Sequence, residues 1–277
     1  MKRKALKVYS WVVLIVVIAA CGTGINLYSR QDEVTLGKQF DEEIHNNPDE
    51  YPIYHGNPAV KQYISDNIFR EILNAQEVQY ESTYNYEIEI LDDDATMNAF
   101  AVPGGYVFVY TGLIKYLGSE AALAGVIAHE IAHVERRHST QQMTNQYGLQ
   151  ILASMALGEN PSQVSTIVAN LVSGMTILAN SRDAEDEADE YAIKYLAGTK
   201  YYPGGVKFFF ERMKADGKVE ESAGFETFFS THPDPIDRIN TANERLEQRG
   251  EPIYNYDDYG KEGIYRDSYV TNVLNRI

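Results

Sequence analysis

The sequence contains a single cysteine and comparatively few basic residues. Among its 277 residues there is one Cys, and 24 Lys and Arg stand against 40 Asp and Glu, a net charge of −16. One Cys excludes both an intrachain disulfide and a cysteine-rich zinc site. The acidic excess argues against nucleic acid as a partner, because phosphate binding requires a basic face. With 44% hydrophobic residues, the composition is that of a globular protein rather than a disordered chain.

The start of the chain has the features of a secretory leader. Four basic residues precede an uncharged apolar run at 11–20, and Cys21 follows directly. A basic start, an apolar run of about ten residues and small residues at its end are typical of a cleaved signal peptide. The run is shorter than the ~20 apolar residues that a membrane-spanning helix needs. Residues 18–21, Ile-Ala-Ala-Cys, also resemble a bacterial lipobox, which implies that Cys21 is lipidated and becomes the mature N-terminus.

Cleavage before Cys21 would produce a tethered, strongly acidic protein. Removing the four basic residues of the leader from the total of 24 leaves 20 against 40 acidic residues. A lipid on Cys21, rather than surface charge, would then hold the protein to a membrane. We therefore expect a signal peptide at 1–20, a lipidated tether at 21–30, one main domain at 31–250 and a Tyr-rich tail at 251–277.

Hydrophobic periodicity predicts that the main domain is α+β and mainly helical. Alternation of apolar and polar residues over 84–90 predicts a half-buried strand. Two more strands are expected at 97–102 and 106–110, joined by a Pro-Gly-Gly turn. The helical period dominates the remaining chain. Helices are expected at 32–46, from 58 onward, at 119–138, 141–157, 162–180 and 183–197, from 203 onward, and at 234–250.

The helix expected at 119–138 contains the sequence His-Glu-Ile-Ala-His. His129 and His133 are four residues apart and project from one helix face, so both imidazoles can bind one Zn²⁺. Glu130 is rotated about 100° around the helix axis, where it can act as a general base on a metal-bound water. The flanking residues are apolar, and polar side chains among them are costly to bury unless a metal satisfies them. A surface helix with two solvated histidines is the alternative.

A catalytic zinc needs a third protein ligand as well as an open position. The helix expected at 183–197 offers Glu185 and Asp189, which are four residues apart and share a face. Either carboxylate can bind the metal while the other accepts a hydrogen bond from a ligating histidine. A solvated acidic face is the alternative, because acidic runs on helices are usually exposed.

Four stretches together resemble the HtpX and CAAX-prenyl-protease family of zinc metallopeptidases, in its soluble periplasmic branch typified by BepA. These stretches are 98–105 with 111–113, 129–133, 181–189 and 231–233. The resemblance implies a zincin-type metallopeptidase domain that has a small β-sheet with an edge strand at the active site. It further implies that this edge strand, with Asn98, Ala99 and Phe100, binds the substrate.

The same resemblance distributes roles among the candidate site residues. It implies that Glu185 is the third zinc ligand and that Asp189 supports the ligands. It also implies that His232 can occupy the fourth zinc position and hold the enzyme latent. Tyr191 and His232 are candidates for stabilising the oxyanion. The repeat extension through which BepA docks to its partners is not expected in this chain.

The residues and the resemblance together predict a zinc-dependent endopeptidase with one Zn²⁺ per chain. Its expected substrates are unfolded or misassembled envelope proteins. Its expected location is the periplasmic side of a membrane, the outer membrane in a Gram-negative cell, with the lipid on Cys21 as anchor. One alternative is a zinc-bound chaperone or assembly lipoprotein with latent or secondary proteolysis. Another is a structural zinc site that His232 closes permanently.

Overall fold

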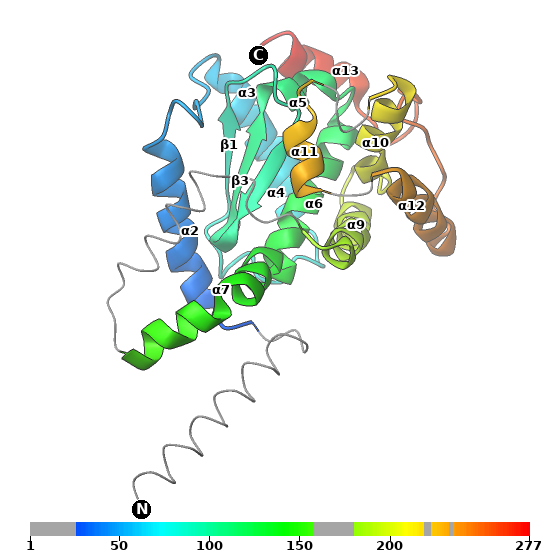
Figure 1. Cartoon of the computed structure of the whole chain (residues 1–277). Coiled ribbons are helices and arrows are strands. Elements are labelled where there is room, and N and C mark those ends of the chain that lie inside the picture. The colour runs from blue at the N-terminus through cyan, green and yellow to red at the C-terminus, as the bar shows by residue number, and fades with distance from the viewer. Residues whose placement is uncertain (1–25, 158–179, 219–222, 233–234) are drawn as a thin grey trace, which may run out of the picture.

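The computed structural model describes residues 26–157, 180–218, 223–232 and 235–277 (Figure 1). The predicted signal peptide, Cys21 and residues 162–179 lie outside this part of the chain. The described helices are α2 (Arg30–His45), α3 (Pro58–Tyr63), α4 (Arg70–Leu73), α5 (Thr111–Tyr116), α6 (Glu120–Arg136), α7 (His138–Leu157), α9 (Arg182–Ala197), α10 (Gly205–Ala215), α11 (Glu226–Thr231), α12 (Pro235–Arg249) and α13 (Arg266–Tyr269). Shorter helical turns are the π-helical η1 (Ile64–Phe69) and η3 (Val270–Leu274) and the 3-10 turn η2 (Pro103–Gly105).

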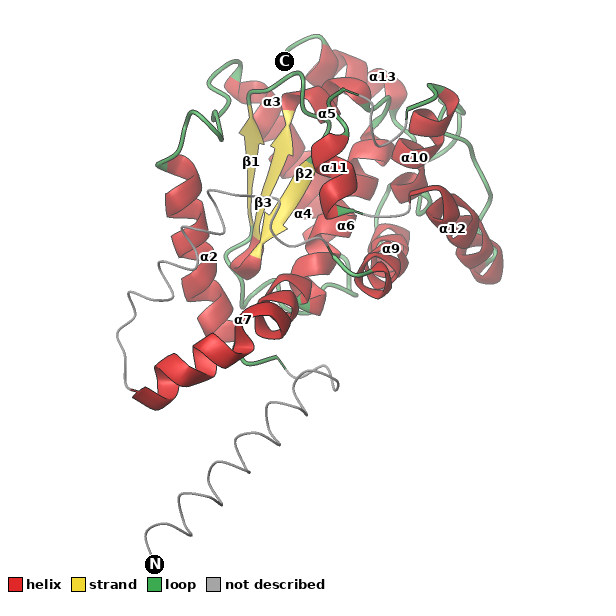
Figure 2. Ribbon diagram, viewed as in Figure 1, coloured by secondary structure: helices red, strands yellow, loops and turns green. Residues whose placement is uncertain are grey.

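Three strands form one small mixed sheet (Figure 2). They are β1 (Glu87–Leu91), β2 (Ala99–Val102) and β3 (Tyr106–Tyr110), in the spatial order β1-β3-β2. The strand β3 pairs in parallel with β1 and antiparallel with β2. The tight connection between β2 and β3 depends on glycine, because Gly104 and Gly105 adopt φ values of 85° and 108°, which other residues rarely tolerate. Because β3 lies between β1 and β2, the strand predicted to bind substrate, β2, is an edge strand.

Both faces of the sheet are buried, which gives the domain three layers. On one face, Phe100 and Phe108 pack with Leu36 and Phe40 of α2 in one core cluster. The opposite face of β3 joins the larger core cluster, which includes most of α6. The alternation of side chains along a strand explains how β3 serves both clusters. The α+β, mainly helical fold class predicted from the sequence is confirmed.

The helix α6 runs through the centre of the molecule. Its N-cap is Ser119, whose hydroxyl accepts a hydrogen bond from the backbone N–H of Ala122 at 3.2 Å. Nearly all of its residues are buried, as expected of a helix that is apolar on most of its circumference. The helices α9 and α10 pack against it. This position is what carries the His-Glu-Ile-Ala-His sequence into the interior.

The contact between α6 and α10 depends on two glycines. A Cβ atom on Gly125 would lie 2.3 Å from the carbonyl carbon of Gly205 and 2.3 Å from the backbone nitrogen of Val206. Because backbone atoms cannot swing aside, we expect Gly125→Ala to force α6 and α10 apart and to lower the free energy of unfolding by about 1–3 kcal/mol. Thermal unfolding measures this, with Gly148→Ala in α7 as the control. Among the described residues, the atom nearest to its Cβ would lie 3.6 Å away, so it should be neutral or stabilising by up to about 1 kcal/mol. Equal effects of the two substitutions would contradict the packing argument.

The structure departs from the predicted elements at two places that concern the site. The sequence predicts a helix to about residue 138, but α6 ends at Arg136 because Arg137 adopts a left-handed conformation with φ 66°. The chain turns there and α7 begins at His138. The short helix α11, which immediately precedes His232, is not predicted from the sequence. Both features place histidines near the centre of the molecule.

The Tyr-rich segment after α12 contributes to the same core. Ile264, Tyr269 and Val273 are fully buried in the larger cluster, and the Tyr269 hydroxyl donates to the carbonyl oxygen of Ile114 at 2.6 Å. Ala121, at the start of α6, donates its backbone N–H to the carbonyl oxygen of Ile264. Within the described part of the chain, no helix combines the length and apolar character needed to cross a membrane.

Candidate metal centre

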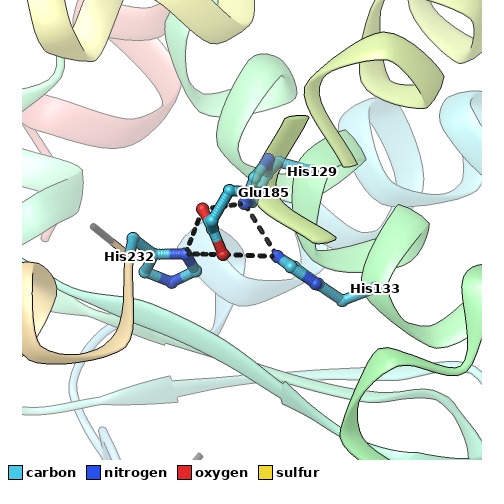
Figure 3. Close-up of side chains that lie close together, drawn as sticks. All are labelled: His129, His133, Glu185 and His232. Atoms are coloured by element: carbon cyan, nitrogen blue, oxygen red, sulfur yellow. Dashed lines mark hydrogen bonds and ion pairs between the residues drawn. The ribbon is translucent and has the colours of Figure 1, made fainter. Parts of the chain in front are cut away.

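Four buried side chains from three parts of the fold converge beside the sheet (Figure 3). His129 and His133 come from α6, Glu185 comes from the first turn of α9, and His232 directly follows α11. Each offers one nitrogen or oxygen atom, and these atoms all lie within 4.8 Å of one another. The structure thus brings together the two histidines, the glutamate and the candidate latch residue that were predicted from the sequence.

The distances within this group suit a shared metal ion. Nε2 of His129 lies 2.9 Å from Nε2 of His133 and 3.3 Å from a carboxylate oxygen of Glu185. Nδ1 of His232 lies 3.0 Å from Glu185. Ligands bound at 2.0–2.1 Å to a tetrahedral zinc lie roughly 3.4 Å apart. Imidazole and carboxylate donors are those that Zn²⁺ accepts in the absence of thiolates, so the donor set fits that metal.

Glu130, predicted from the sequence as the general base, also lies at this group. It is buried, and its Oε1 lies 3.7 Å from Nε2 of His232. Burial raises its pKa above the usual value, which makes it a better proton acceptor than an exposed carboxylate. His129, Glu130, His232 and Ala99 of β2 line a common cavity of only about 20 Å³. That volume holds about one water molecule.

Asp189 lies one helical turn beyond Glu185 and holds His129. Its Oδ1 accepts a hydrogen bond from Nδ1 of His129 at 2.9 Å, which leaves Nε2 of that ring directed at the other ligands. Arg238 of α12 donates to Asp189 through Nε and Nη2, each at 2.6 Å, and to Glu185 through Nη1 at 2.7 Å. One buried guanidinium therefore links both acids of α9.

Neighbouring charges keep the carboxylates of Glu185 and Asp189 ionised. Burial raises the pKa of Glu185, but His232 and Arg238 outweigh it and hold that pKa well below its usual range. Arg238 likewise overcomes the burial of Asp189 and lowers its pKa to about 2. Burial opposes the charged form of His129, yet Glu185 and Asp189 raise its pKa to about 9. Opposite charges within a few ångströms account for all three directions.

The remaining residues predicted from the sequence are Asn98, Ala99 and Phe100 of the edge strand and the oxyanion candidate Tyr191. Ala99 lines the small cavity, whereas the ring of Phe100 stacks on Phe108 on the other face of the sheet, with centroids 4.9 Å apart. Asn98 is buried, and neither polar atom of its side chain has a hydrogen-bond partner among the described residues. Tyr191 packs against the Tyr195 ring and beneath the Arg136 guanidinium.

Sequence reasoning did not identify three side chains that support the site. Arg238 binds the carboxylates of Glu185 and Asp189. His138 contacts His133, and Glu187 in turn contacts His138. Arg238 comes from a helix with no chemical motif of its own. His138 is five residues after His133, a spacing that puts it on another face of a continuous helix. Only the left-handed turn at Arg137 returns it to the site.

Comparison with known proteins agrees with this geometry. The chain is 30% identical over 214 residues to the beta-barrel assembly-enhancing protease of Yersinia pestis, covering 73% of this chain and 42% of that protein. It is 28% identical over 200 residues to the protein of that name in Escherichia coli, covering 69% and 40%. It is also 32% identical over 170 residues to the mitochondrial metalloendopeptidase OMA1 of Schizosaccharomyces pombe, covering 60% and 48%.

The family assignment rests on the part of the chain that carries the site. The chain spans less than half the length of the relatives named above. Residues 59–246 match the sequence profile of Peptidase family M48. This range contains both histidines of α6, Glu130, the two acids of α9, His232 and Arg238. A buried metal-binding group and a profile that covers most of the domain lead to one assignment: the chain belongs to peptidase family M48.

Proposed function

We propose that this protein is a zinc-dependent endopeptidase that acts on unfolded or misassembled proteins of the bacterial cell envelope. The observation that carries the proposal is the buried group of His129, His133 and Glu185 with Glu130 beside it. The three ligands would hold the Zn²⁺, which when bound polarises a carbonyl group and makes a water molecule acidic near neutral pH. A purely structural metal site does not require a buried general base next to its ligands.

Within this proposal the protein's own residues divide the chemistry. The carboxylate of Glu130 accepts a proton from the attacking water and then donates it to the nitrogen of the leaving amine. Asp189 keeps Nδ1 of His129 occupied, so that Nε2 is available as a ligand. The edge strand β2, whose Ala99 lines the cavity beside His129, would pair with an extended substrate. Pairing through backbone groups provides affinity with little sequence preference.

The substrate class and location rest on the relatives and on the leader. Two of the relatives are named for enhancing beta-barrel assembly, which supports a role in the envelope. The basic and apolar start of the sequence, followed by Cys21, supports export and attachment through a lipid on that residue. On this basis we assign the protein to the periplasmic face of a membrane.

His232 is proposed to act as a latch on this activity. Its ring stacks on Phe228 of α11, and its Nδ1 faces Glu185 at 3.0 Å. Phe228 and His232 also line the small cavity beside Glu130 and Ala99. Cleavage requires that the segment carrying α11 and His232 moves, and the fraction of molecules in which it has moved sets the observed rate.

The proposal is tested by cleavage of an unfolded protein such as casein. We expect the full chain to cleave it, a chelator to stop cleavage, and Zn²⁺ to restore it. His232→Ala should cleave several-fold faster than the wild type, because it removes the competing ligand. Thr231→Ala is the matched control, since among the described residues the Thr231 hydroxyl bonds to backbone carbonyls of α11 and to no side chain of the metal group.

One outcome would overturn the endopeptidase in favour of a chaperone. If the wild type and His232→Ala both contain zinc and both bind unfolded casein but neither cleaves it, the protein acts by holding clients. Loss of zinc from His232→Ala would contradict the latch and indicate a permanent fourth ligand.

A further inference from the structure

A chain of three side chains leads from the metal group to the surface. Nδ1 of His133 lies 2.8 Å from Nδ1 of His138. Nε2 of His138 lies 2.9 Å from Oε2 of Glu187, and Oε1 of the same carboxylate accepts a hydrogen bond from Nε of Arg136 at 2.9 Å. His133 and His138 are buried, whereas the Glu187 side chain is 37% exposed. The chain therefore connects an interior ligand with an anchored carboxylate at the protein surface.

The order of donors and acceptors in this chain is fixed by its outer end. An ionised carboxylate can only accept hydrogen bonds, so Nε2 of His138 must carry the hydrogen that faces Glu187. A neutral imidazole carries a single N–H, which leaves Nδ1 of His138 as an acceptor. Nδ1 of His133 must then carry the hydrogen that lies between the two rings. Nε2 of His133 is left with a lone pair.

That lone pair points into the metal group. Nε2 of His133 lies 2.9 Å from Nε2 of His129 and 3.3 Å from Oε1 of Glu185, so it is the ligating atom of the ring. The opposite tautomer would place a hydrogen on Nε2 and block the metal. A free histidine has no strong preference between the two nitrogens, and its environment must make the choice.

The backbone brings the three residues together from separate helices. His133 lies near the end of α6, His138 begins α7 after the left-handed residue Arg137, and Glu187 lies on α9. Glu187 is two residues after Glu185, so it projects from a different part of α9 and reaches His138 rather than the metal. This arrangement differs from that at His129, where a single carboxylate, Asp189, contacts the ligand directly.

We propose that His138 and Glu187 are positioning residues for the metal, and that they hold His133 in the tautomer and ring orientation whose Nε2 binds it. Without His138, the buried Nδ1–H of His133 loses its acceptor. An unsatisfied buried donor is costly, and the ring would turn or change tautomer to relieve it. The proposal concerns metal affinity, so it stands or falls independently of peptide cleavage.

The test is the zinc affinity of the full chain, measured by competition with a chromophoric chelator. We expect His138→Ala to weaken zinc binding about 10–100-fold, the effect typical of removing the partner of a ligating histidine. His138→Asn places an amide oxygen where Nδ1 lay, so it should restore the affinity to within about threefold of the wild type. Glu187→Ala should weaken binding less than His138→Ala, because water can accept the hydrogen of His138 at the exposed end.

A control separates this role from a general loss of packing. Met143 is fully buried in the core on α7, the helix that begins with His138, and belongs to the cluster formed by α2 and the sheet. Met143→Ala should lower the thermal unfolding temperature while leaving the zinc affinity of the folded protein unchanged. A purely structural role for His138 would make His138→Ala behave in the same way.

Proton NMR detects the hydrogen on Nδ1 of His133 directly. In the zinc-loaded wild type, Nδ1–H of His133 should give a slowly exchanging downfield proton signal, which His138→Ala should lose and His138→Asn should keep. The proposal is overturned if His138→Ala binds zinc as tightly as the wild type, if His138→Asn binds as weakly as His138→Ala, or if His133 in the wild type carries its hydrogen on Nε2. If His138→Ala does not fold, the other two variants test the proposal. Zinc affinity that is unchanged in Glu187→Ala, or that is lost in His138→Asn, would overturn it.

Discussion

Replacing Glu130 with glutamine is expected to reduce cleavage of an unfolded protein at least about 100-fold, the lower end of what a positioned general base contributes. Glutamine has nearly the same shape but cannot accept the proton from water. Zinc content should not change, because the proposed ligands are His129, His133 and Glu185 and do not include Glu130. The measurement is zinc content together with the initial rate of casein cleavage for the two proteins.

The same substitution should not destabilise the fold. Burial raises the pKa of Glu130, which means that the folded protein disfavours its charged form relative to the unfolded chain. This contribution opposes folding at any pH above the raised pKa. A neutral amide removes it, so Glu130→Gln should unfold at the same temperature as the wild type or a higher one. Such a gain is typical where an active-site group is kept at some cost in stability.

Glu135→Gln provides a matched control on the same helix. Glu135 is also buried, but it accepts hydrogen bonds from the backbone of Gln79 and Tyr80 and from the Tyr86 hydroxyl. Its replacement should leave zinc content and cleavage unchanged. If Glu130→Gln retains more than a tenth of the wild-type rate, Glu130 is not the base.

Replacing Arg238 with methionine is expected to have the largest effect on stability. Arg238 is the buried cation that binds both Asp189 and Glu185, at 2.6–2.7 Å. Methionine keeps much of the length of the side chain but removes the guanidinium that binds both buried carboxylates. Breaking a buried ion pair from one side costs about 3–5 kcal/mol. Urea unfolding of the full chain in excess chelator measures this difference without a contribution from bound metal.

The pH dependence of that loss follows from the pKa of Asp189. Arg238 lowers this pKa to about 2, so the wild type gains stability from Asp189 above the unfolded value of about 3.9 and loses it as the pH falls toward 2. The variant lacks this gain. The difference in stability between the two proteins should therefore be greatest near neutral pH and shrink between about pH 4 and 2.

Arg245 on the same helix supplies the comparison. Its guanidinium pairs with Asp186 at 2.7 Å, and the Asp186 side chain is 57% exposed. Exposed pairs contribute about 0–1 kcal/mol, so Arg245→Met should cost little. Equal losses for Arg245→Met and Arg238→Met would show that the helix, rather than the buried charges, determines the effect.

The sequence predicts the candidate metal-binding residues of α6 and α9 because each pair belongs to a single helix. His129 and His133, like Glu185 and Asp189, are four residues apart, and helix geometry alone puts each pair on one face. Spacing does not decide which acid binds the metal. The family resemblance favours Glu185, and the structure places that carboxylate, rather than Asp189, among the four converging side chains.

The supporting residues could not be predicted because their contacts depend on tertiary structure. Arg238 reaches α9 only after α12 has packed beside it. His138 reaches His133 only because Arg137 takes a left-handed conformation, which is uncommon outside glycine and has no clear signal in a single sequence. The sheet shows the same contrast: alternation at 84–90 predicts a strand that overlaps β1, and the Pro-Gly-Gly turn predicts that two strands flank it, but neither predicts that β3 would be the central strand.

The buried C-terminal segment has a consequence for the order of folding. In the first turn of α6, the Ala121 N–H donates a hydrogen bond to the carbonyl oxygen of Ile264, and Glu120 shares the Tyr63 hydroxyl with Ser268. These late residues are synthesised more than a hundred positions after the helix that carries His129 and His133. Domains generally fold as units once their core is complete. The N-terminal turn of α6 therefore reaches its final hydrogen bonding only after the segment around Ile264 has been synthesised, so we expect the helix that carries His129 and His133 to be completed late in folding.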